Sequence, residues 1–246
     1  MKMISSYEKS GGWLFRYRSF LPLLAAPLFI AGLRSFEYID HSHFKTELWG
    51  MVCLFVSLLG LAVRFFSVGS APRGTSGRNT KSQKAETLNT TGIYSIMRHP
   101  LYLGNYLGML GFCMFFRNLW LVLLATCLFA LYYERIMFAE EAFLSKRFGD
   151  IFENWAAVTP SIFPRMKGWV SPQHSFSWRT GLRREYTGFF LVIGGFAILD
   201  TVADSIHESR WHVDFHWAIA FAGASVVYLV LRSIKKYSDF LHVEGR

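Results

Sequence analysis

Residues 92–104 read GIYSIMRHPLYLG, and the interpretation of the whole chain starts from this stretch. Arg98, His99 and Pro100 come directly before a long apolar run. Proline has no N–H group, and the first turn of a helix does not need one, so Pro100 is well placed to begin a helix. The free N–H groups at such a helix start favour carboxylates and phosphates. We therefore expect Arg98 and His99 at the mouth of a membrane helix; the alternative is a charged anchor at the membrane boundary.

The composition indicates a polytopic membrane protein. Apolar residues make up 52% of the 246 residues and fall in long uncharged blocks, which a soluble domain does not show. The net charge is +9, and the basic residues flank the apolar blocks. We therefore interpret the charge as membrane topology and attraction to lipid headgroups, and not as nucleic-acid binding. The three cysteines lie within apolar blocks, so we expect no disulfide framework.

We expect an all-α protein with about six transmembrane helices. Lys and Arg concentrate in the N-terminal segment, the 69–100 loop, the 134–185 segment and the C-terminal tail. By the positive-inside rule, these parts and both termini lie in the cytoplasm, with the chain in a bacterial inner membrane. The 134–185 segment is expected to lie along the membrane interface. The expected spans are 20–33, 48–68, 101–116, 119–133, 186–202 and 215–234.

Polar residues near these spans have mostly structural interpretations. Arg64 is expected to snorkel at the end of its span. Asp200 and Asp204 are expected at a helix end, with an intramembrane function as the alternative. His41 and His43 are expected to be an exposed loop pair, with a metal site as the alternative.

His212 and His216 have the spacing of a metal-binding pair on a helix. The other possible metal ligands close to His212 and His216 in the sequence are Asp214 and Glu208. Because this face lies opposite the basic loops, we expect no metal site.

Two adjacent carboxylates, Glu140 and Glu141, follow the fourth apolar block by one or two helical turns. Consecutive helix positions point about 100° apart, so the two side chains cannot serve one role. One can face a pocket while the other pairs with a nearby cation; a solvated helix face is the alternative. Spans 101–116 and 119–133 form a tight hairpin, so we expect residues 98–102 and 135–141 to converge on one site.

A resemblance to a known superfamily rests on two stretches, GIYSIMRHPLYLG at 92–104 and YYERIMFAEEAFLSKRFGDIFENW at 132–155, followed by Pro160 and Pro164. They resemble the isoprenylcysteine carboxyl methyltransferase and phospholipid methyltransferase superfamily. The resemblance implies an integral-membrane enzyme that binds S-adenosylmethionine between the ends of membrane helices and a cytoplasmic segment. By motif position it implies that His99, Pro100, Tyr102 and Gly104 border the cofactor, that Glu140 or Glu141 holds its polar end, and that Arg98 and Arg135 organise the site.

The resemblance also implies the domain organisation. The chain, 1–246, is expected to be one integral-membrane domain. Residues 92–164 form its methyltransferase core, and 186–234 form an additional helical hairpin.

The residue chemistry agrees with the implied cofactor. Glu140 can accept from the ammonium or ribose of S-adenosylmethionine, and Arg98 suits its carboxylate. Tyr94 and Tyr102 can attract the sulfonium through cation–π contacts. Methyl transfer to an oxyanion needs no general base, so positioning and exclusion of water can supply on the order of 7–11 kcal/mol. The expected catalytic residues are Arg98, Arg135 and Glu141.

The acceptor is expected to be an anionic membrane lipid. Arg117-Asn118-Leu119 stands where prenyl-protein members of the superfamily have Asn-Pro. The stretch RGTSGRNT offers Arg73 and Arg78 to a phosphate, with a linker as the alternative. The most specific form of this expectation is methylation of the 1-phosphate of lipid A, a reaction that some bacterial members of the superfamily carry out. The alternative acceptors are a prenylcysteine carboxylate and a phospholipid amine. The alternative to an enzyme is a membrane scaffold or transporter with a degenerate cofactor site. The sequence does not define the oligomeric state.

Overall fold

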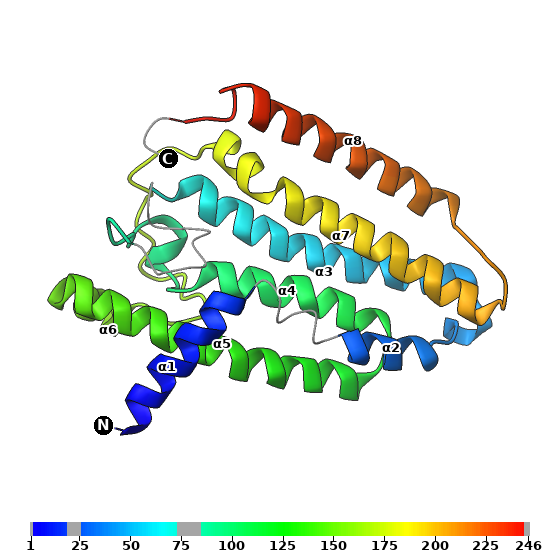
Figure 1. Ribbon diagram of the computed structural model, residues 1–246, viewed down its shortest axis with the longest axis horizontal. Coiled ribbons are helices and arrows are strands. Elements are labelled where there is room, and N and C mark those ends of the chain that lie inside the picture. Colours follow the sequence, from blue (N-terminus) through cyan, green and yellow to red (C-terminus); the bar gives the residue numbers. More distant parts are fainter. Residues whose placement is uncertain (1, 19–25, 73–84, 244–246) are drawn as a thin grey trace.

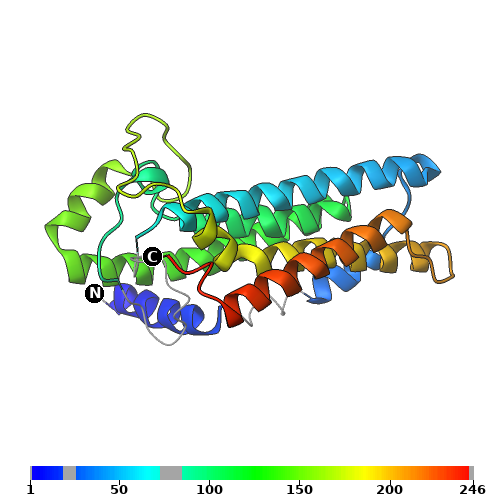
Figure 2. The same cartoon turned by 90° about the horizontal axis from the view of Figure 1, so that it is seen from above.

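The computed structural model describes residues 2–18, 26–72 and 85–243, and its regular structure is helical, as expected (Figure 1). In order of packing, α8, α7, α3, α4, α5 and α1 lie side by side, and the longer helices form an elongated bundle (Figures 1 and 2). The helices are α1 (Lys2–Tyr17), α2 (Ala26–Arg34), α3 (His43–Ser70), α4 (Pro100–Phe115), α5 (Leu119–Phe148), α6 (Asp150–Val158), α7 (Trp178–His207) and α8 (Phe215–Tyr237), with 3-10 turns η2 (Ile39–His41) and η3 (Gly92–Ser95).

Among the described residues, four helices are long and apolar enough to cross a membrane: α3, α5, α7 and α8. The chain is therefore an integral membrane protein, but the expected six spans are not confirmed. Helix α4 has 16 residues, or about 24 Å at 1.5 Å per residue, which is less than a hydrocarbon core of about 30 Å. Helix α2 has nine residues, and 19–25, part of the expected first span, lie outside the described residues.

Glycines bring α3 and α4 into backbone contact. A Cβ atom on Gly60 would lie 2.4 Å from the carbonyl oxygen of Gly104, and one on Gly111 would lie 2.3 Å from that of Cys53. The Ser57 hydroxyl donates to the carbonyl of Gly108 at 2.8 Å. Small residues allow this close approach between helices in a membrane. Helices α3 and α4 therefore form a tightly fixed pair at the centre of the bundle.

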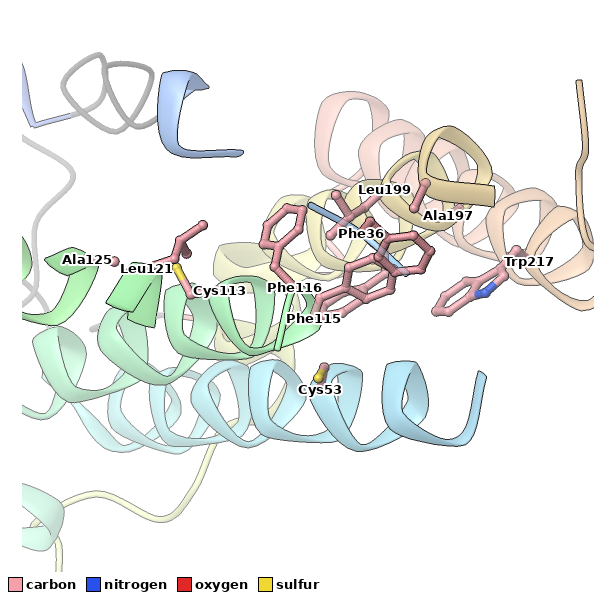
Figure 3. Close-up of a cluster of buried hydrophobic side chains, with 12 residues drawn as sticks. Phe36, Cys53, Cys113, Phe115, Phe116, Leu121, Ala125, Ala197, Leu199 and Trp217 are labelled. Carbon is pink, nitrogen blue, oxygen red and sulfur yellow. The ribbon is translucent and has the colours of Figure 1, made fainter. Parts of the chain in front are cut away.

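An aromatic core joins this pair to α7 and α8 (Figure 3). The ring of Phe115 stacks on Phe36 with centroids 5.5 Å apart. Phe196 of α7 stacks between Phe112, at 4.4 Å, and Trp217 of α8, at 6.2 Å. These contacts between large aromatic surfaces fix the helices relative to one another.

Local sequence signals set the α4–α5 hairpin. Pro100 occupies the first turn of α4, as predicted. Asn118 caps α5 by accepting a hydrogen bond from the Leu121 N–H at 3.1 Å. Because the connection is this short, the start of α4 and the second half of α5 lie at the same end of the bundle.

Candidate active site

The candidate site lies where η3 and the start of α4 meet the second half of α5, α6 and the chain that follows α6. The Arg98 N–H donates to the carbonyl of Pro160, and the His99 N–H donates to that of Ser161, both at 2.9 Å. The Trp155 indole donates to the carbonyl of Tyr94 at 3.1 Å. The irregular segment after α6 is thereby fastened along the chain that leads into α4.

Arg98 and Glu141 form a two-pronged ion pair between α4 and α5. Arg98 Nε and Nη2 donate to the two carboxylate oxygens at 2.9 and 3.3 Å, the arrangement in which Arg–carboxylate pairs are strongest. Arg98 Nη1 donates to the carbonyls of Ala156 and Thr159 at 2.7 and 2.9 Å. The buried ring of His99 contacts Glu141 Oε1 through Nε2 at 2.8 Å. The convergence expected for residues 98–102 and 135–141 is present, and its centre is a structural clamp.

Glu140 points in a different direction from Glu141. Its Oε2 accepts a hydrogen bond from the Tyr102 hydroxyl at 2.6 Å, and His99 Nδ1 lies 3.8 Å away. The side chain is 33% exposed and is not part of the Arg98–Glu141 ion pair. Glu140 is therefore a carboxylate with capacity to accept hydrogen bonds from a ligand.

Tyrosine rings surround this carboxylate. Tyr102 packs against His99, with centroids 5.4 Å apart, and against Tyr133 at 4.8 Å. Burial raises the pKa of Tyr94 well above its ordinary range, and the negative charge of Glu140 raises it further. Tyr94 therefore remains a neutral phenol at physiological pH, and the site offers electron-rich rings beside one carboxylate.

Sequence reasoning missed a second polar group that joins this site to α7. Arg64 was expected to snorkel, but it donates to both carboxylate oxygens of Glu185 at 2.8 Å. Arg64 Nη1 also donates to the side-chain oxygen of Asn105 at 2.5 Å, and Asn105 donates to the Tyr133 hydroxyl at 2.9 Å. Glu185 lies 121 positions after Arg64 in the chain, so the spacing of residues gave no signal for this pair.

Two of the predicted site residues lie elsewhere. Arg135 donates to the Ser10 hydroxyl at 3.2 Å and lies over the Tyr7 ring at 4.6 Å, so it packs against α1. A Cβ on Gly104 would lie 2.5 Å from Arg64 Cγ, which shows that Gly104 faces α3. The structure therefore does not place Arg135 or Gly104 where the motif positions implied.

The remaining predicted residues divide into two groups. Pro100 is buried and begins α4, so it positions the residues before it. Arg73 and Arg78 lie outside the described residues.

A groove lies between α3, α7 and α8 and has an almost entirely apolar lining. Glu185, the partner of Arg64, is one of its lining residues. The others are Leu58, Leu61, Ala62, Phe65, Phe66, Leu182, Tyr186, Phe189, Val227 and Leu231. Through Arg64, the groove is connected to the hydrogen-bonded residues of the candidate site.

Part of the chain is similar to a known family. Residues 47–151, from α3 to the start of α6, match the phospholipid methyltransferase family. No solved structure matches the chain.

Three curated relatives are similar to part of the chain. The nickel-cobalt-cadmium resistance protein NccN of Alcaligenes xylosoxydans xylosoxydans is 30% identical over 48% of this chain and 55% of its own length. The cobalt-zinc-cadmium resistance protein CzcN of Cupriavidus metallidurans is 35% identical over 44% of this chain and 50% of its own length. The protein-S-isoprenylcysteine O-methyltransferase of Schizosaccharomyces pombe is 34% identical over 35% of this chain and 36% of its own length. The chain thus spans about half the length of the first two relatives and a smaller share, 36%, of the third.

Proposed function

We propose that this chain, whose residues 47–151 match the phospholipid methyltransferase family, is an S-adenosylmethionine-dependent membrane methyltransferase that acts on an anionic lipid headgroup. Its similarity to an isoprenylcysteine methyltransferase supports the same reaction class. The observation that carries the proposal is Glu140, a partly exposed carboxylate bonded to Tyr102 at the junction of helix ends.

The residues around Glu140 suit S-adenosylmethionine. Glu140 would accept hydrogen bonds from the ammonium or the ribose hydroxyls, and the rings of Tyr94 and Tyr102 would attract the sulfonium. The bound cofactor supplies an electrophilic methyl group. Arg98 and Glu141, expected to be catalytic, are instead proposed as positioning residues, because their polar atoms already hold α4, α5 and the end of α6 together.

The apolar groove supports a lipid acceptor. Its lining belongs to α3, α7 and α8, all long and apolar enough to lie in the membrane, so a lipid chain would be buried there by the hydrophobic effect. Glu185, at the polar edge of the groove, is hydrogen-bonded to Arg64. Arg64 is in turn connected through Asn105 to Tyr133. We propose that the acyl chain lies in the groove while the headgroup lies at its polar edge, beside Arg64 and Asn105.

A phosphate oxygen is the proposed acceptor atom. As an anion it needs no general base, so the chain's residues have to orient the headgroup and exclude water. The lipid A version rests on Arg73 and Arg78 alone, and both lie outside the described residues. Two relatives are named for metal resistance, which is a property of the cell and does not define an acceptor. A prenylcysteine carboxylate or a phospholipid amine is therefore an alternative outcome of the test below.

The test separates cofactor binding from acceptor identity. Purified protein should bind S-adenosylmethionine in calorimetric titration, and Glu140→Gln should weaken binding at least tenfold, because a hydrogen bond to a charged group contributes about 1.5–3 kcal/mol. The matched control is Glu134→Gln, which removes an exposed carboxylate of the same helix. Membranes incubated with methyl-labelled cofactor should then yield a labelled anionic lipid. Unchanged cofactor affinity in Glu140→Gln would overturn the assignment of the site.

A further inference from the structure

A second polar cluster lies at the opposite end of the bundle, where α3 begins, α7 ends and α8 begins. It comprises His43 in the first turn of α3, Asp204 in the last turn of α7, His212 in the connection and Asp214 at the start of α8. One nitrogen or oxygen atom from each of the four side chains lies within 4.8 Å of the others. Three separate parts of the chain therefore converge on a mixed imidazole and carboxylate site.

The spacing of the donor atoms approaches that of a metal site. His43 Nε2 lies 3.0 Å from Asp204 Oδ2 and 3.3 Å from Asp214 Oδ2. His212 Nε2 lies 3.0 Å from Asp214 Oδ1. Four ligands bound tetrahedrally at zinc distances of about 2.0–2.1 Å are separated by about 3.3 Å. A metal ion therefore requires small side-chain adjustments and no rearrangement of the helices.

Hydrogen bonding within the cluster is incomplete. His43 Nε2 carries at most one proton, so when it donates to Asp204 it cannot also donate to Asp214. Asp214 Oδ2 is buried and has no hydrogen-bond partner among the described residues. A buried carboxylate oxygen without a donor is costly, and a cation between the two aspartates would satisfy it.

Asp200 supplies an independent indication. It lies one helical turn before Asp204 and is only 5% exposed, yet its Oδ2 has no hydrogen-bond partner within the described chain. Its carboxyl group interacts electrostatically with Asp204, Asp214 and His43, and it lies beside the indole of Trp217. Three aspartates thus lie near one another in a largely buried site, where a cation would offset the repulsion between their carboxylates.

Two basic side chains at this end of the bundle form ion pairs with acids other than the four candidate ligands. Arg210 pairs with Glu208 at 2.8 Å, and Lys45 pairs with Asp40 at 2.7 Å. Glu47 adds a further carboxylate, 3.7 Å from His43 Nδ1 and 3.5 Å from His216 Nδ1. Among the described residues, no lysine or arginine forms an ion pair with Asp204 or Asp214.

We propose that His43, Asp204, His212 and Asp214 bind a divalent transition-metal ion, with Asp200 and Glu47 in support. Two imidazole nitrogens and two carboxylate oxygens suit Zn²⁺ and its neighbours Co²⁺ and Ni²⁺, whereas Mg²⁺ and Ca²⁺ prefer oxygen ligands alone. The bound ion would tie the start of α3 to the α7–α8 hairpin. The sequence alone favoured no metal here, because Asp214 and Glu208 were the only further ligands near His212 and His216 and this face lies opposite the basic loops. Folding supplies His43 and Asp204, 161 positions apart.

The test uses the full chain in detergent, purified without a histidine tag and stripped with a chelator. After incubation with ZnCl₂ and desalting, elemental analysis should find one zinc per chain, and excess MgCl₂ should not displace it. His212→Gln and Asp204→Asn should each lower zinc affinity at least tenfold. The matched control is His41→Asn, which removes an exposed histidine at the same end and should retain the metal.

Two further measurements keep the result interpretable. Zinc should raise the unfolding temperature of the wild type and His41→Asn but not that of His212→Gln, whose fold is checked by size-exclusion chromatography. Glu140→Gln should bind zinc normally, so failure of the methyltransferase proposal is distinguishable from failure of this one. Absence of stoichiometric zinc in the wild type, or equal affinity in all three histidine and aspartate variants, would overturn the metal site.

Discussion

The two neighbouring glutamates of α5 show how one residue step separates two roles. Glu141 is bound by Arg98 and His99, whereas Glu140 accepts from Tyr102 and is open to a ligand. We expect Glu141→Gln to lower the free energy of unfolding by about 1–3 kcal/mol, because it leaves the half-buried Arg98 without its charged partner. Chemical denaturation in detergent measures this loss.

The comparison with Glu140→Gln makes the prediction specific. That variant should change the free energy of unfolding by less than about 0.5 kcal/mol, since the amide oxygen still accepts from Tyr102, while its affinity for S-adenosylmethionine falls. If Glu141→Gln were fully stable, the clamp assigned to Arg98 and Glu141 would have no energetic basis.

The sequence predicted the divergence of Glu140 and Glu141 because helix periodicity is a local property. It did not predict that Arg98 is fully occupied, since two of its acceptors are the carbonyls of Ala156 and Thr159 at the end of α6. Backbone carbonyls carry no residue-type signal. For this reason Arg98 and Glu141 were expected to be catalytic, although their contacts favour a positioning role.

At the scale of helices, the α3–α4 contact depends on which glycines face it. We expect Gly104→Ala to destabilise the protein by about 1–3 kcal/mol, because the new methyl group would meet the backbone of Gly60 and the side chain of Arg64. Displacement of Arg64 should also lower methyl transfer. Thermal unfolding and an activity assay measure the two effects.

Gly108→Ala is the matched control on the same helix. A Cβ at Gly108 has no atom within 4 Å, and alanine favours a helix over glycine by up to about 1 kcal/mol. This variant should be as stable as the wild type or slightly more stable. Equal destabilisation by both substitutions would show that helix propensity, and not the close contact, governs this face.

Helix boundaries were predictable where the determining residues are adjacent in sequence. Pro100 and Asn118 are such cases, and the hairpin between α4 and α5 follows from them. Partners on distant helices were not predictable: Arg64 finds Glu185, and His43 finds Asp204, only after α7 packs against α3. The expected number of spans is not confirmed, because apolar composition does not distinguish a full span from the 16-residue α4.

For the whole molecule, the α7–α8 hairpin connects two proposed sites at opposite ends of the bundle. It lies outside the region, 47–151, that matches the methyltransferase family. Nevertheless, α7 provides Glu185 to the groove beside the candidate active site and Asp204 to the proposed metal site. The hairpin would therefore both complete the lipid-binding side of the bundle and anchor its far end.

This arrangement predicts that the two ends lie on opposite sides of the membrane. The candidate site is surrounded by the basic segments that the positive-inside rule places in the cytoplasm. Ser171, after α6, and Ser209, between α7 and α8, are exposed markers of the two ends. In a background with Cys53, Cys113 and Cys127 replaced by serine, a membrane-impermeant maleimide should label Ser209→Cys in intact cells and Ser171→Cys only after permeabilisation. Labelling of both positions from the same side would contradict the assignment of α7 as a membrane-crossing helix, and would remove the separation between a cytoplasmic methyltransferase site and a metal site on the other face.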